Sequence, residues 1–224
     1  MAGGKYTPAG DEKTCGGNLS LLSEILIPFK GDRLIEWYHD LNELWHNTGP
    51  IEPEDHHSPT GMTQTIHYCN FTLWHLEDEV RRADVPAPKV VECKRLIDLH
   101  NQRRNDTVER IDVWIDNVLK NANIEPDADV EMNSETPGSI IDRLSIVCLK
   151  IYHMNEQQER DDVDSEHKKM AKMRVGILTE QRDDLSRALD KLILDLRQAH
   201  KRHKIYRQFK MYNDPRFSPT LNKK

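Results

Sequence analysis

The residue types that could do chemistry gather on one stretch of the sequence. Its polar positions recur at steps of three and four residues: Asn70, Trp74, Glu77 and Arg81, with Asp78 one position round. Such steps place side chains along one face of a helix. The sequence therefore predicts a polar stripe in which two carboxylates adjoin an arginine, an amide and an indole ring.

Complementary polar groups occur on two later stretches that are also predicted to be helical. The first is a long amphipathic stretch that carries Asn101, Arg104, Asp106, Glu109 and Asp112. The second is a strongly apolar stretch that carries Asp142 and Arg143. Because charged groups inside a helical bundle need polar partners, we expect the three stretches to form one network of acids, arginines and amides.

Two interpretations of this network stay open. In one, it is a structural polar core that fixes how the helices pair. In the other, it lines a pocket where arginines hold an anionic group and a carboxylate acts as acid, base or Mg²⁺ ligand. The candidate ligand-binding residues are Trp74, His75, Arg81, Asn101, Arg104 and Arg143, and the candidate catalytic residues are Glu77, Asp78 and Asp142.

No metal site is predicted from the sequence. Glu36 with His39, and Glu43 with His46, have the Glu-x-x-His spacing of di-iron bundles. Both pairs lie on one predicted helix, whereas a di-iron site takes such motifs from separate helices. The sequence also lacks a glycine-rich phosphate loop, a Cys-x-x-Cys pair and a Gly-x-Ser-x-Gly motif. We therefore expect no cofactor, with Mg²⁺ on the carboxylates as the alternative.

The elements that must position these groups are helices. Apolar residues recur at steps of three and four over most of the chain, and 31% of its 224 residues are charged. We expect helices over about 19–27, 32–46, 62–83, 88–122, 137–154 and 165–203. The sequence thus predicts an all-α, antiparallel bundle of five to six helices, two of them long.

Two of the expected helices have distinctive faces. The helix over 137–154 is apolar on nearly every side, which is typical of a central helix surrounded by others. The helix over 165–203 places Met170, Met173 and Ile177 on the face that we expect to point inward. The domain then comprises residues 18–224, after a leader over 1–17 that is predicted to be disordered.

Charge and apolar runs limit the expected partners and location. The net charge of −6 makes general nucleic-acid binding unlikely, although the segment from Arg197 to Lys224 has nine basic residues against Asp214. We expect that basic segment to dock on the helical domain. No apolar run reaches the length of a membrane span, and three of the four cysteines fall on apolar faces, so a cytoplasmic protein is predicted.

Six ordered motifs resemble an uncharacterised bacterial family, the domain of unknown function 4254. The motifs begin at Trp74 (WHLED), Asn101 (NQRRND), Asn133 (NSETP), Ile141 (IDRLSI), Leu149 (LKIYHM) and Lys210 (KMYNDP). The resemblance runs from about residue 19 to residue 221. It implies an accessory role in envelope polysaccharide synthesis, but no activity, substrate or cofactor.

The functional expectation has two forms. The first is a homo-oligomeric helical protein that binds a partner protein or a small anionic ligand at the region of Glu77, Arg81, Arg104 and Asp142. The second is an enzyme that acts on a phosphorylated or sugar-nucleotide substrate through the same residues. The missing catalytic motifs favour the first form.

Overall fold

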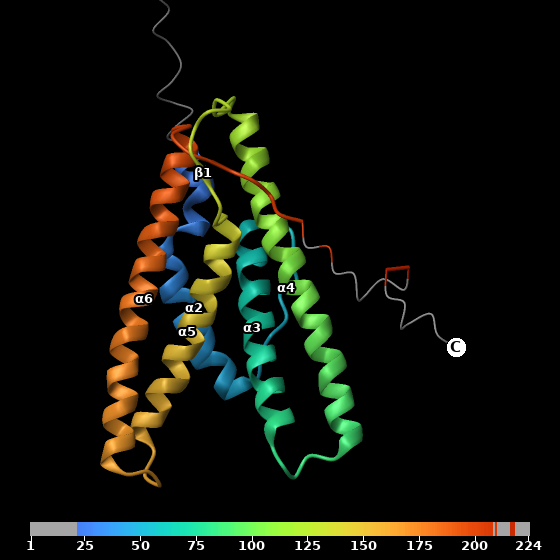
Figure 1. Cartoon of the computed structure of the whole chain (residues 1–224), viewed down its shortest axis with the longest axis vertical. Helices are drawn as coiled ribbons and strands as arrows, with labels where there is room; N and C mark the ends of the chain where they lie inside the picture. The colour runs from blue at the N-terminus through green and yellow to red at the C-terminus, as the bar shows by residue number, and fades with distance from the viewer. Residues whose placement is uncertain (1–21, 208, 210–215, 218–224) are drawn as a thin grey trace, which may run out of the picture.

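The chain folds into helices that run mainly along one long axis (Figure 1). The computed structural model describes residues 22–207, 209 and 216–217. Its elements are a helical turn at 22–26, the 3-10 helix η1 (Ile27–Phe29), α2 (Gly31–Thr48), α3 (Pro59–Arg81), α4 (Ala87–Asn121), α5 (Pro137–Glu159), α6 (Ser165–Arg197), and the parallel strands β1 (Met132–Asn133) and β2 (Arg202–His203). The predicted all-α class is confirmed, and the predicted leader lies outside the described residues.

Two antiparallel hairpins make up most of the fold. Helices α3 and α4 form one hairpin, α5 and α6 form the other, and α2 packs against α5 and α6 (Figure 1). Helix α5 contacts all four other long helices, in agreement with its apolar character on nearly every side. Its central place brings its few polar residues next to those of α3 and α4.

The start of α5 is fixed by a capping box and by a carboxylate from α4. The Thr136 side chain accepts a hydrogen bond from the Ser139 backbone N–H, and the Ser139 side chain accepts one from the Thr136 N–H. Asp112 accepts the Gly138 N–H at 2.8 Å. A Cβ atom at residue 138 would lie 2.6 Å from the Val108 carbonyl oxygen, so this close approach requires glycine.

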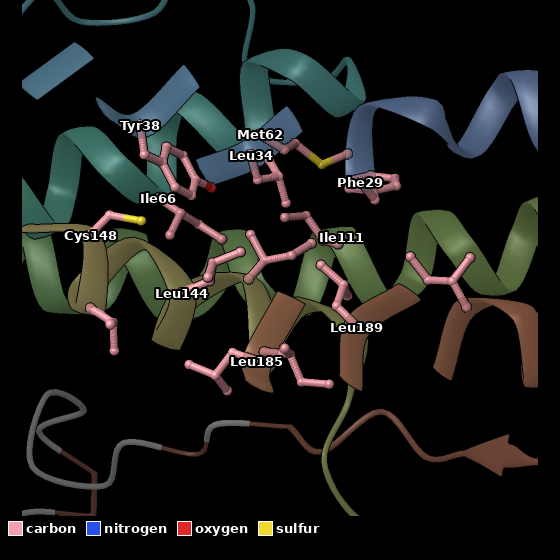
Figure 2. Close-up of a cluster of buried hydrophobic side chains, with 14 of the residues drawn as sticks. Phe29, Leu34, Tyr38, Met62, Ile66, Ile111, Leu144, Cys148, Leu185 and Leu189 are labelled. Carbon is pink, nitrogen blue, oxygen red and sulfur yellow. The ribbon is translucent and has the colours of Figure 1, made fainter. Parts of the chain in front are cut away.

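The hydrophobic core lies where the five helices meet (Figure 2). Each helix contributes a fully buried side chain: Tyr38, Ile66, Ile111, Leu144 and Leu189. Burying an aliphatic side chain of this size contributes roughly 1.5–3 kcal/mol. The core therefore holds the two hairpins in a fixed register, which also sets the distances between their polar side chains.

The expectation for the first half of α6 was wrong. Met170, Met173 and Ile177 are 39%, 60% and 49% exposed, and the buried residues of α6 other than Ala171 begin at Leu185. The turn end of the α5–α6 hairpin stands apart from that of the α3–α4 hairpin (Figure 1), so this part of α6 packs on few neighbours. An apolar face with the right spacing is thus left uncovered.

The end of α6 also differs from the expected one. The helix stops at Arg197 rather than near residue 203. Two residues later Ala199 has φ 54°, in the left-handed region that a continuing α-helix excludes. The chain therefore turns away from the helix axis there and reaches β1.

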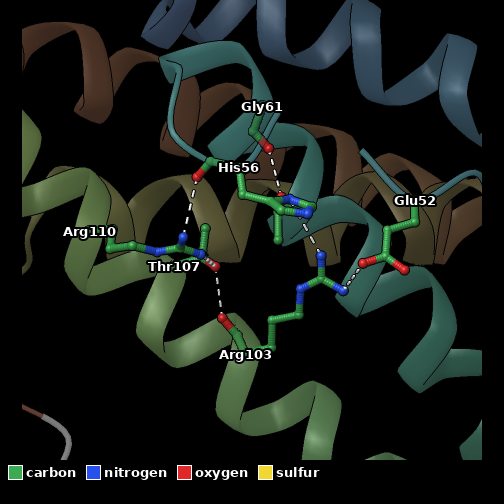
Figure 3. Close-up of polar contacts among 7 residues, drawn as sticks. Glu52, His56, Gly61, Arg103, Thr107 and Arg110 are labelled. Atoms are coloured by element: carbon green, nitrogen blue, oxygen red, sulfur yellow. Dashed lines mark hydrogen bonds and ion pairs between the residues drawn. The ribbon is translucent and has the colours of Figure 1, made fainter. Parts of the chain in front are cut away.

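The segment between α2 and α3 is tied to α4 (Figure 3). The Arg103 guanidinium pairs with Glu52 at 2.7 Å, and Arg110 donates to the His56 carbonyl oxygen at 3.2 Å. The His56 ring lies 3.3 Å from the Thr65 hydroxyl on α3. These contacts fix a proline- and histidine-rich segment that has no regular structure of its own.

The described part of the basic C-terminal segment lies across α4. Strand β2 pairs with β1, with Met132 opposite Arg202 and Asn133 opposite His203. The His203 ring contacts Asp116 at 2.7 Å, and Arg207 pairs with Glu109. Acidic residues of α4 thus neutralise this part of the basic segment.

Candidate functional site

Polar side chains from α3, α4 and α5 meet at one place beside the core. Asn70 of α3 donates to the Asp142 carboxylate of α5 at 2.8 Å and accepts from Arg104 Nη1 of α4 at 3.1 Å. The Arg104 Nε atom lies 3.7 Å from Asp142, a separation longer than a hydrogen bond, and it is buried with no hydrogen-bond acceptor. We call these three residues the arginine cluster.

Burial and charge act on Asp142 in opposite directions. Loss of solvent raises the pKa of the Asp142 carboxyl, while the Arg104 charge and the Asn70 hydrogen bond lower it. The burial effect is the largest, so the pKa lies above its ordinary value. Asp142 is therefore a carboxyl that takes up a proton more readily than an exposed aspartate.

A buried chain of hydrogen bonds continues from the arginine cluster towards α2. Asn70 also contacts the Ser145 hydroxyl at 3.1 Å, Ser145 contacts His67 Nδ1 at 2.9 Å, and His67 Nε2 contacts Asn42 Oδ1 at 3.0 Å. Since an amide oxygen only accepts, His67 donates through Nε2 and accepts at Nδ1. The donors then run in one direction, from Arg104 to Asn42.

His67 is held neutral within this chain. Its ring is fully buried and stacks on Tyr38 at 4.4 Å between ring centroids. Burial first, and the charge of His46 second, lower the His67 pKa to about 3. A neutral ring matches its hydrogen bonds, since an imidazolium could not accept from Ser145.

A groove of about 430 Å³ opens above the arginine cluster. Most of the residues that the sequence singled out line it: Trp74, Glu77, Asp78, Arg81, Asn101 and Arg104, together with Asn70. At its rim Arg81 pairs with Glu77 at 3.2 Å and with Asp78 at 3.6 Å. The rim thus carries one arginine against two carboxylates. Asn70 and Arg104, the two lining residues that contact Asp142, form the polar floor of the groove.

Two predicted site residues lie elsewhere. Arg143 points away from the groove, because it follows Asp142 by one position on α5, and it pairs with Glu135 on the surface. His75 does not line the groove and instead lies near His46 and His153, with ring centroids 5.1 Å and 5.4 Å away. Six of the nine candidate residues therefore line one groove, and a seventh, Asp142, contacts the lining residues Asn70 and Arg104.

The other acids of α4 have partners outside the groove. Asp112 caps α5 at Gly138, and burial raises its pKa to about 6. Glu109 pairs with Arg207, and Asp106 accepts from Gln102 at 2.6 Å. The expectation that these three acids complement the polar stripe of α3 was wrong, because residues 106–112 lie further along α4 towards the start of α5.

Sequence reasoning missed the buried half of the network. His67 and Ser145 each adjoin apolar residues, and Asn42 lies among charged residues of a helix with a polar face, so none of the three indicates a shared network. A signal was available for Ser145 and for His153, because they are two of the few polar side chains on the predicted central helix. No pattern in the sequence joins them to His67 or His46 on other helices.

Comparison with known proteins gives a family and no function. No curated protein and no solved structure matches the chain. Among the described helices, none combines the length and the apolar composition that crossing a membrane requires. The model of the family described as protein of unknown function (DUF4254) matches residues 61–205, which include all of α4 and α5 and the polar stripe of α3. The resemblance seen in the sequence motifs is therefore confirmed, and the chain belongs to the DUF4254 family.

Proposed function

We propose that this protein binds a small anionic, hydroxyl-bearing ligand, such as a phosphorylated sugar or a sugar nucleotide, in the groove above the arginine cluster. The observation that carries the proposal is the state of Arg104 at the groove floor. Arg104 lines the groove, and among the described residues its guanidinium makes one hydrogen bond, from Nη1 to Asn70, while its Nε atom lies 3.7 Å from the Asp142 carboxylate. A guanidinium with unused N–H groups is suited to a phosphate or carboxylate, which it can bind through two parallel hydrogen bonds.

The rim of the groove supports the hydroxyl-bearing part of the proposal. The Glu77 and Asp78 carboxylates and the Asn101 amide can accept hydrogen bonds from sugar hydroxyls, and Trp74 offers an apolar ring beside them. The volume of about 430 Å³ falls within the range of ordinary small-ligand sites, roughly 300–1,000 Å³. Such a ligand also fits the accessory role in envelope polysaccharide synthesis that the resemblance implies.

Asp142 supports an enzyme as the second candidate function. It is a partly buried carboxyl with a raised pKa, and it contacts Asn70 and Arg104, which line the groove. A carboxyl of this kind can act as a general acid towards a bound ligand. A binding protein would release its ligand chemically unchanged, whereas an enzyme would release a different compound.

The test is calorimetric titration of the full chain with inorganic pyrophosphate, with glucose and with UDP-glucose. We expect UDP-glucose to bind more tightly than either of its parts, because it uses both floor and rim. Arg104→Lys keeps the charge beside Asp142 but loses the planar fork, so it should weaken binding roughly 10- to 100-fold, the worth of one or two charge-assisted hydrogen bonds.

Arg143→Lys is the matched control, because it makes the same change on α5 outside the groove. It should leave binding within about twofold of the wild type, the range of a surface contact. Equal effects of the two substitutions, or no binding of any of the three probes, would overturn the proposal. Conversion of UDP-glucose by the wild type but not by Asp142→Asn would establish the enzyme instead.

The expected location and assembly belong to the same proposal. Cys69, Cys93 and Cys148 are free and buried, which supports a reducing compartment such as the cytoplasm. The exposed Met173 and Ile177 on α6 support a homo-oligomer, because a second copy would cover them.

A further inference from the structure

Three histidines from three different helices converge on one point. His46 lies in the last turn of α2, His75 on α3 and His153 on α5. One ring nitrogen from each lies within 4.8 Å of the others. Among the described residues no other group of histidines, cysteines and carboxylates converges in this way. We call these three residues the histidine cluster.

Hydrogen bonds fix the ring proton of His46 and of His153 on Nδ1. His46 Nδ1 lies 2.7 Å from the Asn42 carbonyl oxygen, and His153 Nδ1 lies 2.8 Å from Glu156 Oε2. A carbonyl or carboxylate oxygen only accepts, so both Nδ1 atoms donate. In a neutral imidazole the Nε2 atom then carries a lone pair, which is the form that binds a metal ion.

The Nε2 atoms of His46 and His153 lack a hydrogen-bond partner among the described residues. Both His46 Nε2 and His153 Nε2 are buried and have no hydrogen-bond partner. Leaving a buried polar atom unpaired costs about 1–3 kcal/mol, and here both unpaired atoms belong to rings whose candidate ligand atoms lie within 4.8 Å of one another. Nearly all buried polar atoms in proteins are paired, so a shared missing partner is the simplest account of both.

Aromatic neighbours hold the rings in place. Trp74 stacks on His153, with the ring planes 6° apart and the centroids at 4.6 Å. Tyr152 stacks on His46 at 4.1 Å and 20°. Backbone and carboxylate acceptors behind the rings, together with stacked walls beside them, are the outer-shell contacts that orient metal-ligating histidines.

We propose that His46, His75 and His153 bind a divalent transition-metal ion, best matched by Zn²⁺. Three neutral imidazoles suit Zn²⁺, and with three protein ligands a fourth position stays open for water or another ligand. At Zn–N distances of about 2.0–2.1 Å the nitrogens of a tetrahedral site lie ~3.3 Å apart. The rings would therefore move inward by an ångström or so on binding.

An approach for the ion lies beside the cluster. A pocket of about 480 Å³ is lined by His46 and His75 together with Trp45, Phe71 and Lys89. Trp74 connects the cluster to the groove, because it lines the groove and stacks on His153. The metal site does not depend on the proposed ligand of the groove, since the ion can be measured in the absence of any other ligand.

The experiment uses the full chain with its purification tag removed and its metals stripped by a chelator. Zn²⁺ is titrated against a chromophoric chelator, and Co²⁺ is added to a separate sample to record its visible spectrum. We expect one Zn²⁺ per chain with a dissociation constant below about 1 μM, and a Co²⁺ spectrum typical of tetrahedral coordination.

Three variants test the ligands. His46→Gln should weaken Zn²⁺ binding at least 100-fold, since it removes a ligand. Glu156→Gln keeps all three ligands and should weaken binding roughly 10- to 100-fold, through loss of the carboxylate behind His153. His39→Gln, about two turns before His46 on α2 and exposed, should leave affinity unchanged.

The site is overturned if the wild type binds no Zn²⁺ at micromolar concentrations, or if His39→Gln lowers the affinity as much as His46→Gln does. Circular dichroism reports whether each variant is folded. If His46→Gln does not fold, the test rests on Glu156→Gln and on the Co²⁺ spectrum of the wild type. The proposal is refuted if Glu156→Gln binds Zn²⁺ as tightly as the wild type and the Co²⁺ spectrum is octahedral.

Discussion

The arginine cluster and the histidine cluster share two helices, α3 and α5, but they differ in how many of their polar atoms have hydrogen-bond partners. In the arginine cluster Asn70 makes three side-chain hydrogen bonds, and the chain beyond it ends in Asn42 with every donor used in one direction. In the histidine cluster two Nε2 atoms are buried and unpaired. The first arrangement is nearly complete in the protein alone, and the second is not.

This difference separates structural from ligand-binding roles. A buried polar network whose members satisfy one another fixes which helices pair and in which register. Buried nitrogens that face a common point without a partner reduce stability until something binds them. Arg104 is intermediate, because one of its nitrogens has an acceptor and another has none.

The largest expected effect comes from breaking the arginine cluster. Arg104→Met removes the positive charge and leaves the partly buried Asp142 without its ion-pair partner. Loss of one partner of a buried pair costs about 3–5 kcal/mol. Because the two side chains are 22% and 17% exposed, we expect the lower end of this range, measured by urea denaturation as a change in the free energy of unfolding. Part of the cost is recovered below the raised pKa of Asp142, where that carboxyl becomes neutral.

Arg187→Met supplies the control for this comparison. Arg187 pairs with Asp184 at 2.6 Å on the surface of α6, where both side chains are mostly exposed. Such pairs contribute about 0–1 kcal/mol. If both substitutions lower stability by the same amount, the arginine cluster does not hold the hairpins together.

The next largest effect is the pH dependence that His67 gives to the free energy of unfolding. Its pKa falls from an ordinary 6.5 to about 3 in the folded chain, so below pH 6.5 the unfolded chain binds a proton that the folded chain does not. Stability from this group is complete above pH 6.5 and is lost as pH falls towards 3. The loss is about 1.4 kcal/mol per pH unit, or about 3 kcal/mol between pH 6.5 and pH 4.5.

Asp112 changes stability in the opposite direction over part of this range. Its pKa is raised to about 6, so the folded chain gains stability from it as pH falls from 6 towards 3.8. The measurement therefore compares the free energy of unfolding of the wild type with that of His67→Gln, by urea denaturation at several pH values. The free-energy gap between them should change by about 3 kcal/mol over two pH units, and a constant gap would show that His67 is charged in the folded protein.

Prediction from sequence succeeded where periodicity decides the outcome. The spacing of apolar residues identified α3, α4 and α5 to within a few residues, and Thr136 with Pro137 marked the start of α5. The polar stripe of α3 was predicted as one face, and the groove lies along it. One helix carries that information in its own sequence.

Prediction failed where the outcome depends on how helices are placed relative to one another. Met173 has the spacing of a core residue but no neighbouring helix covers it. Arg143 adjoins Asp142 in sequence but points to the other side of α5. His46, His75 and His153 are separated by 29 and 78 residues, and only the packing of α2, α3 and α5 brings them together. Such placements follow from side-chain packing across helices and have no signature in a single sequence.

The smallest expected effect concerns Trp74, which connects the two clusters. Trp74→Leu removes the ring that stacks on His153 but none of the nitrogens of the histidine cluster. An aromatic stack contributes about 0.5–1.5 kcal/mol, so Zn²⁺ affinity should fall by about two- to tenfold in the chelator competition. Trp37→Leu is the matched control, since Trp37 stacks on Tyr38 instead, and it should leave Zn²⁺ affinity unchanged. Equal Zn²⁺ affinity in Trp74→Leu and the wild type would show that the hydrogen bond to Glu156 alone orients His153, and that the groove and the histidine cluster are independent of each other.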